Sequence, residues 1–203
     1  MRIAQLKKEQ IIRTKLASDL HDDLGSTLNS VKVYANLALM EKGSEKYLHK
    51  VKESIQEAIT GTRDIIWVLD DKKDMIEHLF ARIDQFAQPL CEAHGIRYSK
   101  EISDDVMHFK LSQEEKRNLY MILKEAVNNT IKYAGATKLE LLTGLNRNKP
   151  LITIRDNGKG FDELQITEGN GLKNMKRRSA QINYTLKIES QKEIGTAIYL
   201  LKK

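Results

Sequence analysis

The feature that most restricts the fold is the helical spacing of apolar residues in about the first seventy positions. Between residues 2 and 41 only Gly25 disfavours a helix, and Gly43 and Ser44 then supply a stop and a new N-cap. Before this turn the apolar residues recur at steps of three and four, which predicts one long amphipathic helix. They are Leu16, Leu20, Leu24, Leu28 and Val31, with Thr27 in the same stripe.

A second helix is predicted directly after the turn. Its apolar series also alternates steps of three and four, while charged residues fall elsewhere. The series consists of Leu48, Val51, Ile55, Ala58, Thr62, Ile65 and Leu69. Two helices joined by a short turn form an antiparallel hairpin that buries only one face of each helix. Pairing of two hairpins into a four-helix bundle would cover the remaining faces, so we expect a homodimer.

His21 lies just beside the first apolar stripe and is followed by Asp22 and Asp23. A histidine at the edge of a helical seam stays near water, and an adjacent carboxylate can accept a hydrogen bond from its second ring nitrogen. This arrangement suits a nucleophile. A single histidine among acidic residues on a helix is, however, more often a solvated polar residue, and the local pattern does not choose between the two.

Composition limits the class of protein. The chain of 203 residues is 40% hydrophobic and 31% charged, which is ordinary for a soluble globular protein. Cys91 is the only cysteine, so a disulfide within one chain and a cysteine-based zinc site are excluded, which indicates a cytoplasmic location. No apolar run approaches the roughly 20 residues that span a bilayer.

The net charge of +6 does not indicate nucleic-acid binding, because the lysines and arginines are scattered among 28 acidic residues. The densest basic group lies at the N-terminus and consists of Arg2, Lys7, Lys8, Arg13 and Lys15. Two interpretations stay open for this group. It is either a solvated helix face or the start of a helix that emerges from the membrane-proximal part of a longer, membrane-anchored protein.

The second half of the chain mixes helical and strand patterns. Helices are predicted over 75–94, interrupted near its end by Pro89, over 112–134 after a capping box of Ser112 and Glu115, and over 173–182. Strands are predicted over 95–102, 138–145, 151–155, 185–190 and 196–201, with a further candidate at 106–109 and a turn at 146–150. We therefore expect an α helical hairpin over 1–72 followed by an α/β sandwich domain over 73–203.

Two glycine-rich loops stand at the ends of predicted elements. Asp156-Asn157-Gly158-Lys159-Gly160-Phe161 follows a buried strand, where a carboxylate can point into a pocket and the backbone can approach a ligand. Gly169-Asn170-Gly171-Leu172 directly precedes a helix, and backbone amides at a helix start favour phosphate. Glycine turns are common, so each loop alone is a weak signal and only their order is specific.

The order of these segments resembles a known ATPase fold. Glu125-Ala126-Val127-Asn128-Asn129-Thr130-Ile131-Lys132-Tyr133-Ala134 comes first, then the two glycine loops, then Gly195-Thr196. This succession resembles the N, G1, G2 and final GT boxes of the Bergerat-type ATPases, which include histidine kinases and the gyrase, MutL and heat-shock ATPases. The stretch LASDLHDDLGSTLNSVKVYANLAL is similar to the phosphoacceptor helix of bacterial two-component sensor histidine kinases.

The resemblance implies a role for each polar residue of the ATP site. It assigns Asn129 to the coordination of Mg²⁺ and Glu125 to the orientation of a metal-bound water. Lys132 would face the phosphates. Asp156 would accept a hydrogen bond from the adenine amino group of ATP.

The resemblance also assigns the glycines and one threonine. Gly158 and Gly160 would let the backbone approach the base and would form the hinge of the nucleotide lid. Gly169 and Gly171 would flank the phosphates. The Thr196 hydroxyl would support the adenine from behind.

The resemblance implies that His21 is autophosphorylated from ATP and that Asp22 fixes the tautomer of its ring. The phosphoryl group would then pass to an aspartate in the receiver domain of a response regulator. Ser26 stands where many relatives carry the Gln that positions water for dephosphorylation of the regulator. Two alternatives are a dimeric, nucleotide-binding signalling adaptor and another Bergerat-fold ATPase or serine kinase without histidine phosphorylation.

Overall fold

The computed structural model describes residue 25 and residues 27–41, 44–70, 73–162 and 170–203. The chain divides into two compact units, residues 1–72 and residues 73–203. His21, Asp22, Ser26 and Gly169 lie outside the described residues, as does most of the first predicted helix.

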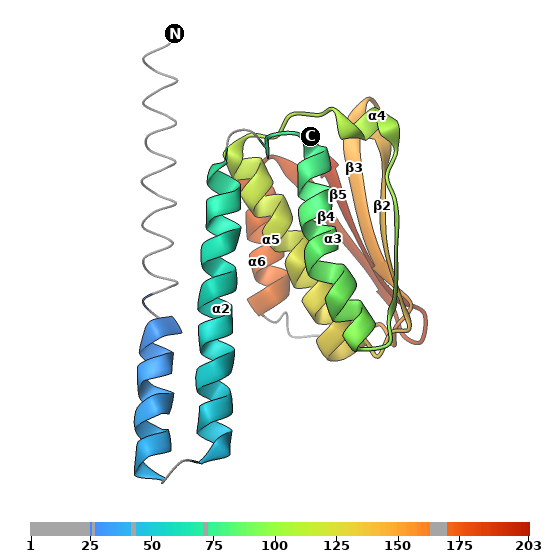
Figure 1. The fold of residues 1–203 in the computed structure, drawn as a ribbon. Coiled ribbons are helices and arrows are strands. Elements are labelled where there is room, and N and C mark those ends of the chain that lie inside the picture. The colour runs from blue at the N-terminus through green and yellow to red at the C-terminus, as the bar shows by residue number, and fades with distance from the viewer. Residues whose placement is uncertain (1–24, 26, 42–43, 71–72, 163–169) are drawn as a thin grey trace, which may run out of the picture. The chain divides into compact units, whose positions relative to one another are not determined.

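The first unit is helical in its described part. Residues 27–40 form a helix, and α2 (Glu45–Leu69) follows it and runs alongside it (Figure 1). Ser44 occupies the N-cap position of α2, as predicted, but its side chain makes no capping hydrogen bond. Among the described helices, none combines the length and hydropathy that crossing a membrane requires.

The second unit begins with α3 (Ile76–Ala93). The prediction that Pro89 interrupts this helix was wrong, since the helix continues past it to Ala93. A proline removes one backbone hydrogen bond, but Ala87 and Cys91 are buried on either side and hold the helix in place. The predicted strand at 106–109 was also wrong. The short helix α4 (Asp104–Met107) begins before this segment and ends within it, and its two acidic residues in the first turn favour a helix start.

The capping box of the next helix is confirmed. In α5 (Gln113–Asn129), the Ser112 hydroxyl accepts a hydrogen bond from the backbone of Glu115, and the Glu115 carboxylate accepts one from the backbone of Ser112. The helix does not continue as an α-helix to its predicted end. A π-helical turn, η2 (Thr130–Ala134), follows it and ends at Gly135 in the left-handed conformation, with φ of 61°.

Five strands form one mixed sheet in the order β1-β2-β3-β5-β4. They are β1 (Arg97–Glu101), β2 (Lys138–Asn146), β3 (Lys149–Asp156), β4 (Tyr184–Gln191) and β5 (Gly195–Lys202). Only the β1–β2 pair is parallel. The turn between β2 and β3 is shorter than predicted, because Arg147 and Asn148 adopt φ of 50° and 60° and form a two-residue hairpin turn.

Helices α3, α5 and α6 (Asn170–Gln181) cover one face of the sheet (Figure 1). Because side chains alternate along a strand, one face of each strand supplies the core. The fully buried core side chains include Leu79 and Ile83 of α3, Leu119 and Leu123 of α5, and Leu141, Ile152 and Leu200 of the sheet. The predicted α/β sandwich is confirmed. This packing sets the end of β3 beside the end of α5.

Candidate functional site

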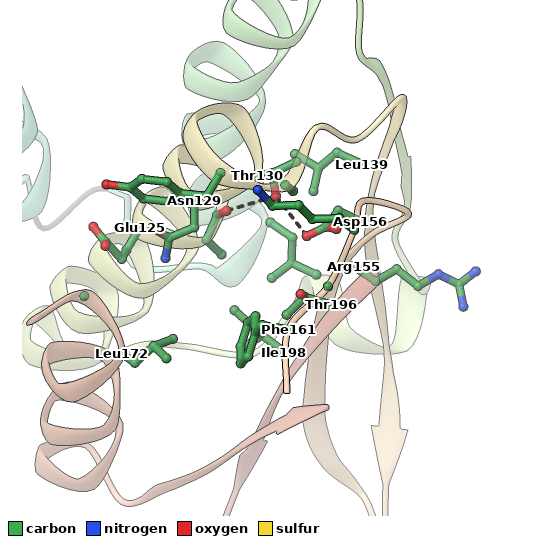
Figure 2. Close-up of a pocket in the computed structure, with 17 residues that line it drawn as sticks. Glu125, Asn129, Thr130, Leu139, Arg155, Asp156, Phe161, Leu172, Thr196 and Ile198 are labelled. Carbon is green, nitrogen blue, oxygen red and sulfur yellow. Dashed lines mark hydrogen bonds between the residues drawn. The ribbon is translucent and has the colours of Figure 1, made fainter. Parts of the chain in front are cut away.

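A cavity of about 540 Å³ opens between α5, η2, the end of β3, the start of α6 and β5 (Figure 2). Its volume is typical of a small-molecule site. Apolar side chains supply much of the lining, namely Ala126, Ala134, Leu139, Ile154, Phe161, Leu172 and Ile198. The polar side chains stand at its sides, and Glu125 and Asp156 lie on opposite sides of the cavity in Figure 2. The site can therefore enclose a flat apolar group with a polar contact at each end.

Asp156, the last residue of β3, presents its carboxylate to the cavity. Its Oδ1 accepts a hydrogen bond of 2.9 Å from the Gly158 backbone amide. Its Oδ2 lies 3.3 Å from the Thr130 hydroxyl. Two donors from separate elements thus hold this carboxylate, and its remaining lone pairs can accept a hydrogen bond from a ligand.

The Asn157 side chain, by contrast, forms hydrogen bonds within the protein. Its Oδ1 accepts hydrogen bonds of 2.9 Å and 2.8 Å from the backbone amides of Thr137 and Lys138. Its Nδ2 donates to the Thr137 hydroxyl. The asparagine therefore ties the loop after β3 to the start of β2 and leaves ligand contacts to its neighbour Asp156.

Close backbone contacts explain Gly158 and Gly160. A Cβ on Gly158 would lie 2.5 Å from the Ala134 carbonyl oxygen, which also accepts a hydrogen bond from the Lys159 amide. Gly160 has φ of +56°, and a Cβ there would collide with the Gln191 carbonyl. In the described structure the two glycines pack the loop against η2 and the β4–β5 turn. Their approach to a nucleotide base stays a prediction.

Glu125 and Asn129 lie one helical turn apart near the end of α5, and both line the cavity. A Cβ on Gly171 would collide with the Glu125 carboxylate, so the start of α6 passes directly against this side chain. The structure thus brings together three residues that the sequence only placed in order. Lys132 is exposed and is not among the lining residues, so its contact with phosphates stays a prediction.

Thr196 lines the cavity opposite η2, but its hydroxyl is engaged within the fold. It lies 2.9 Å from the Ser190 hydroxyl, which also accepts a hydrogen bond from the Phe161 amide. Sequence reasoning missed Ser190 and Phe161, and also Thr130. A serine opposite a threonine in the paired strands β4 and β5 was the one available signal.

Arg155 turns away from the cavity in Figure 2. Its Nε donates a hydrogen bond of 2.7 Å to Glu140 on the outer face of the sheet, and Lys138 forms an ion pair with the same carboxylate. Hydrogen bonds from Lys138 and Arg155 hold the pKa of Glu140 below its usual range. The guanidinium of Arg155, which precedes Asp156 in the sequence, is thereby paired with Glu140.

Within the described part of the chain, no group of three or more His, Cys, Asp or Glu side chains could hold a metal ion. Mg²⁺ in nucleotide sites takes only one or two protein oxygens, and the remaining ligands come from phosphates and water. The side-chain oxygens of Glu125 and Asn129 at the cavity wall fit that requirement.

Comparison with family models divides the chain at a similar place. Residues 13–74 match a model described as histidine kinase (HisKA_3). Residues 114–203 match the model of the histidine kinase-, DNA gyrase B- and HSP90-like ATPases (HATPase_c). The second match contains all the described residues that line the cavity.

Relatives with curated descriptions match nearly the whole chain. The sensor histidine kinase LiaS of Bacillus subtilis is 26% identical over 96% of this chain and 55% of its own length. The sensor protein VraS of Staphylococcus aureus is 26% identical over 97% of this chain and 57% of its own. The chain therefore spans about half the length of these curated relatives.

Solved structures share the fold. The Acinetobacter baumannii histidine kinase AdeS superposes with a TM-score of 0.61 at 11% identity, covering 90% of this chain and 97% of AdeS. Full-length ShkA in complex with AMPPNP gives a TM-score of 0.62 at 14% identity, covering 93% of this chain and 45% of ShkA. The predicted succession of a helical hairpin and an ATPase-type α/β domain is confirmed by these matches.

Proposed function

We propose that this chain is the catalytic core of a two-component histidine kinase, an ATP-dependent phosphotransferase that phosphorylates its own His21 and passes the group to a response regulator. The observation that supports this most is the cavity. It gathers Glu125, Asn129 and Asp156 around an apolar enclosure, in a chain that also carries His21-Asp22 in a HisKA_3 region.

The cavity suits an adenine nucleotide. Its apolar lining can enclose the purine, and Asp156 can accept a hydrogen bond from the exocyclic amino group. The opposite wall, with Glu125, Asn129 and the start of α6, would then receive the phosphates. ShkA, which shares the fold, is described in complex with AMPPNP, and this agrees with an adenine nucleotide as the ligand of this chain.

Asn129 would hold Mg²⁺ through its side-chain oxygen, and Glu125 would act through a water. When bound, Mg²⁺ supplies charge neutralisation for the phosphates during phosphoryl transfer. Asn129 is the direct ligand in this proposal, and Glu125 orients a water of the metal.

His21 would act as the nucleophile. A ring nitrogen forms a bond to the γ-phosphorus while the bond to the β-phosphate oxygen breaks, and ADP leaves. Free imidazole has a pKa of about 6.5, so a large fraction is already neutral at pH 7. Asp22 would accept a hydrogen bond from the second ring nitrogen, fix the tautomer and stabilise the positive charge that develops on the ring.

In this proposal residues 1–72 dimerise and carry the phosphoacceptor, and residues 73–203 bind ATP. The partners are a second copy of the chain and the receiver domain of a response regulator. We also propose that this core works in the cytoplasm as part of a longer, membrane-anchored sensor. The basic group of Arg2, Lys7, Lys8, Arg13 and Lys15 and the sensor names of the relatives support that placement.

The test is to incubate the purified chain with Mg²⁺ and γ-labelled ATP, in parallel with His21→Gln. We expect acid-labile, alkali-stable label on the wild type and none on the variant, because phosphoramidates hydrolyse in acid. His108→Gln, a change in the second unit, should keep the label and is the matched control. ATP binding should be equal in all three proteins.

Other outcomes distinguish the alternatives. Bound ATP without label on the wild type would favour the signalling adaptor. Label that persists in His21→Gln and resists acid would favour a serine kinase. A regulator that gains label and then loses it faster with the kinase present would show that the chain has phosphatase activity with Ser26 in place of the Gln.

A further inference from the structure

Thr130 is the first residue of η2, and its side chain is directed toward the carboxylate of Asp156. Only 3% of this residue is exposed. Its hydroxyl oxygen lies 3.1 Å from the Ala126 carbonyl oxygen and 3.3 Å from Oδ2 of Asp156. A hydroxyl has one proton, so the two acceptors compete for it.

The backbone hydrogen bonds of this turn distinguish the two acceptors. The Thr130 amide already donates to the carbonyl oxygens of Ala126 and Val127. The Ala126 carbonyl is therefore satisfied without the hydroxyl. An ionised carboxylate is also a stronger acceptor than a peptide carbonyl. The hydroxyl is therefore available to donate to Asp156.

The π turn makes this contact possible together with a second one. Thr130 at its start contacts Asp156, and the Ala134 carbonyl at its end accepts a hydrogen bond of 2.9 Å from the Lys159 amide. One turn thus holds both the end of β3 and the loop that follows it. Thr196 cannot replace Thr130 in this role, because its hydroxyl lies with Ser190.

We propose that Thr130 is a positioning residue for Asp156 and that it sets the preference of the cavity for a 6-aminopurine over a 6-oxopurine. The proposal rests on the proposed function, in which Asp156 receives the base. An amino group donates to the carboxylate, whereas the carbonyl of a 6-oxopurine repels it. The Thr130 and Gly158 donors hold the carboxylate in one orientation, and a fixed orientation sharpens the discrimination between the two bases.

The experiment compares the affinities for Mg·ATP and Mg·ITP by calorimetry. The proteins are wild type, Thr130→Val, Thr130→Ser and Thr153→Val. Valine keeps the volume and removes the donor, and serine keeps the donor. Thr153 is a buried threonine of the same strand as Asp156 but points to the opposite face of the sheet, so its variant is the matched control.

We expect Thr130→Val to weaken ATP binding about tenfold, since a hydrogen bond to a charged group contributes about that factor. ITP binding should change little, so the preference for ATP should fall by about the same factor. Thr130→Ser should stay within about threefold of the wild type, and Thr153→Val should match it.

An unchanged ratio of ATP to ITP affinity in Thr130→Val would overturn the proposal, and so would an equal loss of both nucleotides. If the wild type itself does not prefer ATP, the role proposed for Asp156 fails, which is a separate result. Should Thr130→Val unfold, Thr130→Cys gives the second variant, because a thiol is a weak donor of similar size. An unchanged nucleotide preference in Thr130→Cys would equally overturn the proposal.

Discussion

The two units differ in where their apolar side chains lie. In the second unit Ile76 and Ile83 have no exposed surface, and the core closes between three helices and the sheet. In the first unit an apolar stripe along α2 remains exposed, with Leu48 at 51%, Ile55 at 44%, Ile59 at 42% and Ile66 at 65%. One unit thus completes its own core, while the other leaves an apolar surface exposed. This difference agrees with the proposal that the first unit dimerises and the second binds ATP.

The largest effect is expected in the first unit. Ile59→Glu introduces a charge into the exposed stripe, and burying an unpaired charge in a bundle costs several kcal/mol, on the order of 3 or more. We expect the proposed homodimer to dissociate to monomers in sedimentation equilibrium, with ATP binding unchanged. Ile194→Glu changes an isoleucine of the second unit that is 61% exposed, more than Ile59, and should leave the mass of the particle unchanged. Equal masses for all three proteins would contradict the comparison.

The next effect tests the close backbone packing of the second unit at the loop after β3. Gly160→Ala combines a strained positive φ with a collision against the Gln191 carbonyl. We expect it to lower the free energy of unfolding by about 3 kcal/mol, measured with urea. Gly135→Ala carries the positive φ alone and should cost about 1 kcal/mol. Gly144→Ala has neither feature and should cost least, and any other order of the three variants would argue against this account.

A smaller effect separates ligand binding from folding within the second unit. Asp156→Asn keeps the size of the side chain but loses the charge that its ligand and the Thr130 hydroxyl share. ATP should bind about 30-fold more weakly, which corresponds to about 2 kcal/mol. The free energy of unfolding, measured with urea, should change by less than the free energy of ATP binding does. The mass of the proposed dimer should not change. If Asp156→Asn kept full ATP affinity, a role for Asp156 in ATP binding would be contradicted.

The smallest effect concerns acid. The folded state lowers the pKa of Glu140 through Lys138 and Arg155, so this carboxylate contributes stability above its unfolded pKa of about 4.3. The contribution disappears as the pH falls through the folded pKa. Glu140→Gln should therefore be less stable than the wild type at pH 7, by less than about 1 kcal/mol, and equally stable near pH 2. High salt should shrink the difference at pH 7, as measured by thermal unfolding.

Elements with local signals were predicted well from the sequence. The Ser112 capping box located the start of α5, and strict alternation located β4 and β5. Signals that depend on distant neighbours were missed. From the sequence alone, Pro89 predicts the interruption of a helix, because the burial of its neighbours is not known at that stage. At 106–109 the apolar pattern predicts a strand, but Asp104 and Asp105 favour the start of a helix instead.

The same distinction applies to the site. The order of motifs placed Glu125, Asn129, Asp156 and Gly171 correctly at one cavity, because each belongs to a recognisable segment. Thr130 could not be identified in this way, since its partner Asp156 is 26 residues away and the contact depends on a π turn. The roles of His21, Asp22 and Gly169 rest on the sequence alone.

The π turn also limits how the length of the chain can vary. An α-helix advances about 100° per residue, so deleting one residue between Asn129 and Gly135 would rotate the C-terminal end of the turn by about that angle. The end of β3 and the loop that follows it are held by the two ends of η2, and a change of length there would release at least one of the two anchors. Evolution can therefore exchange side chains within this turn far more easily than it can insert or delete a residue.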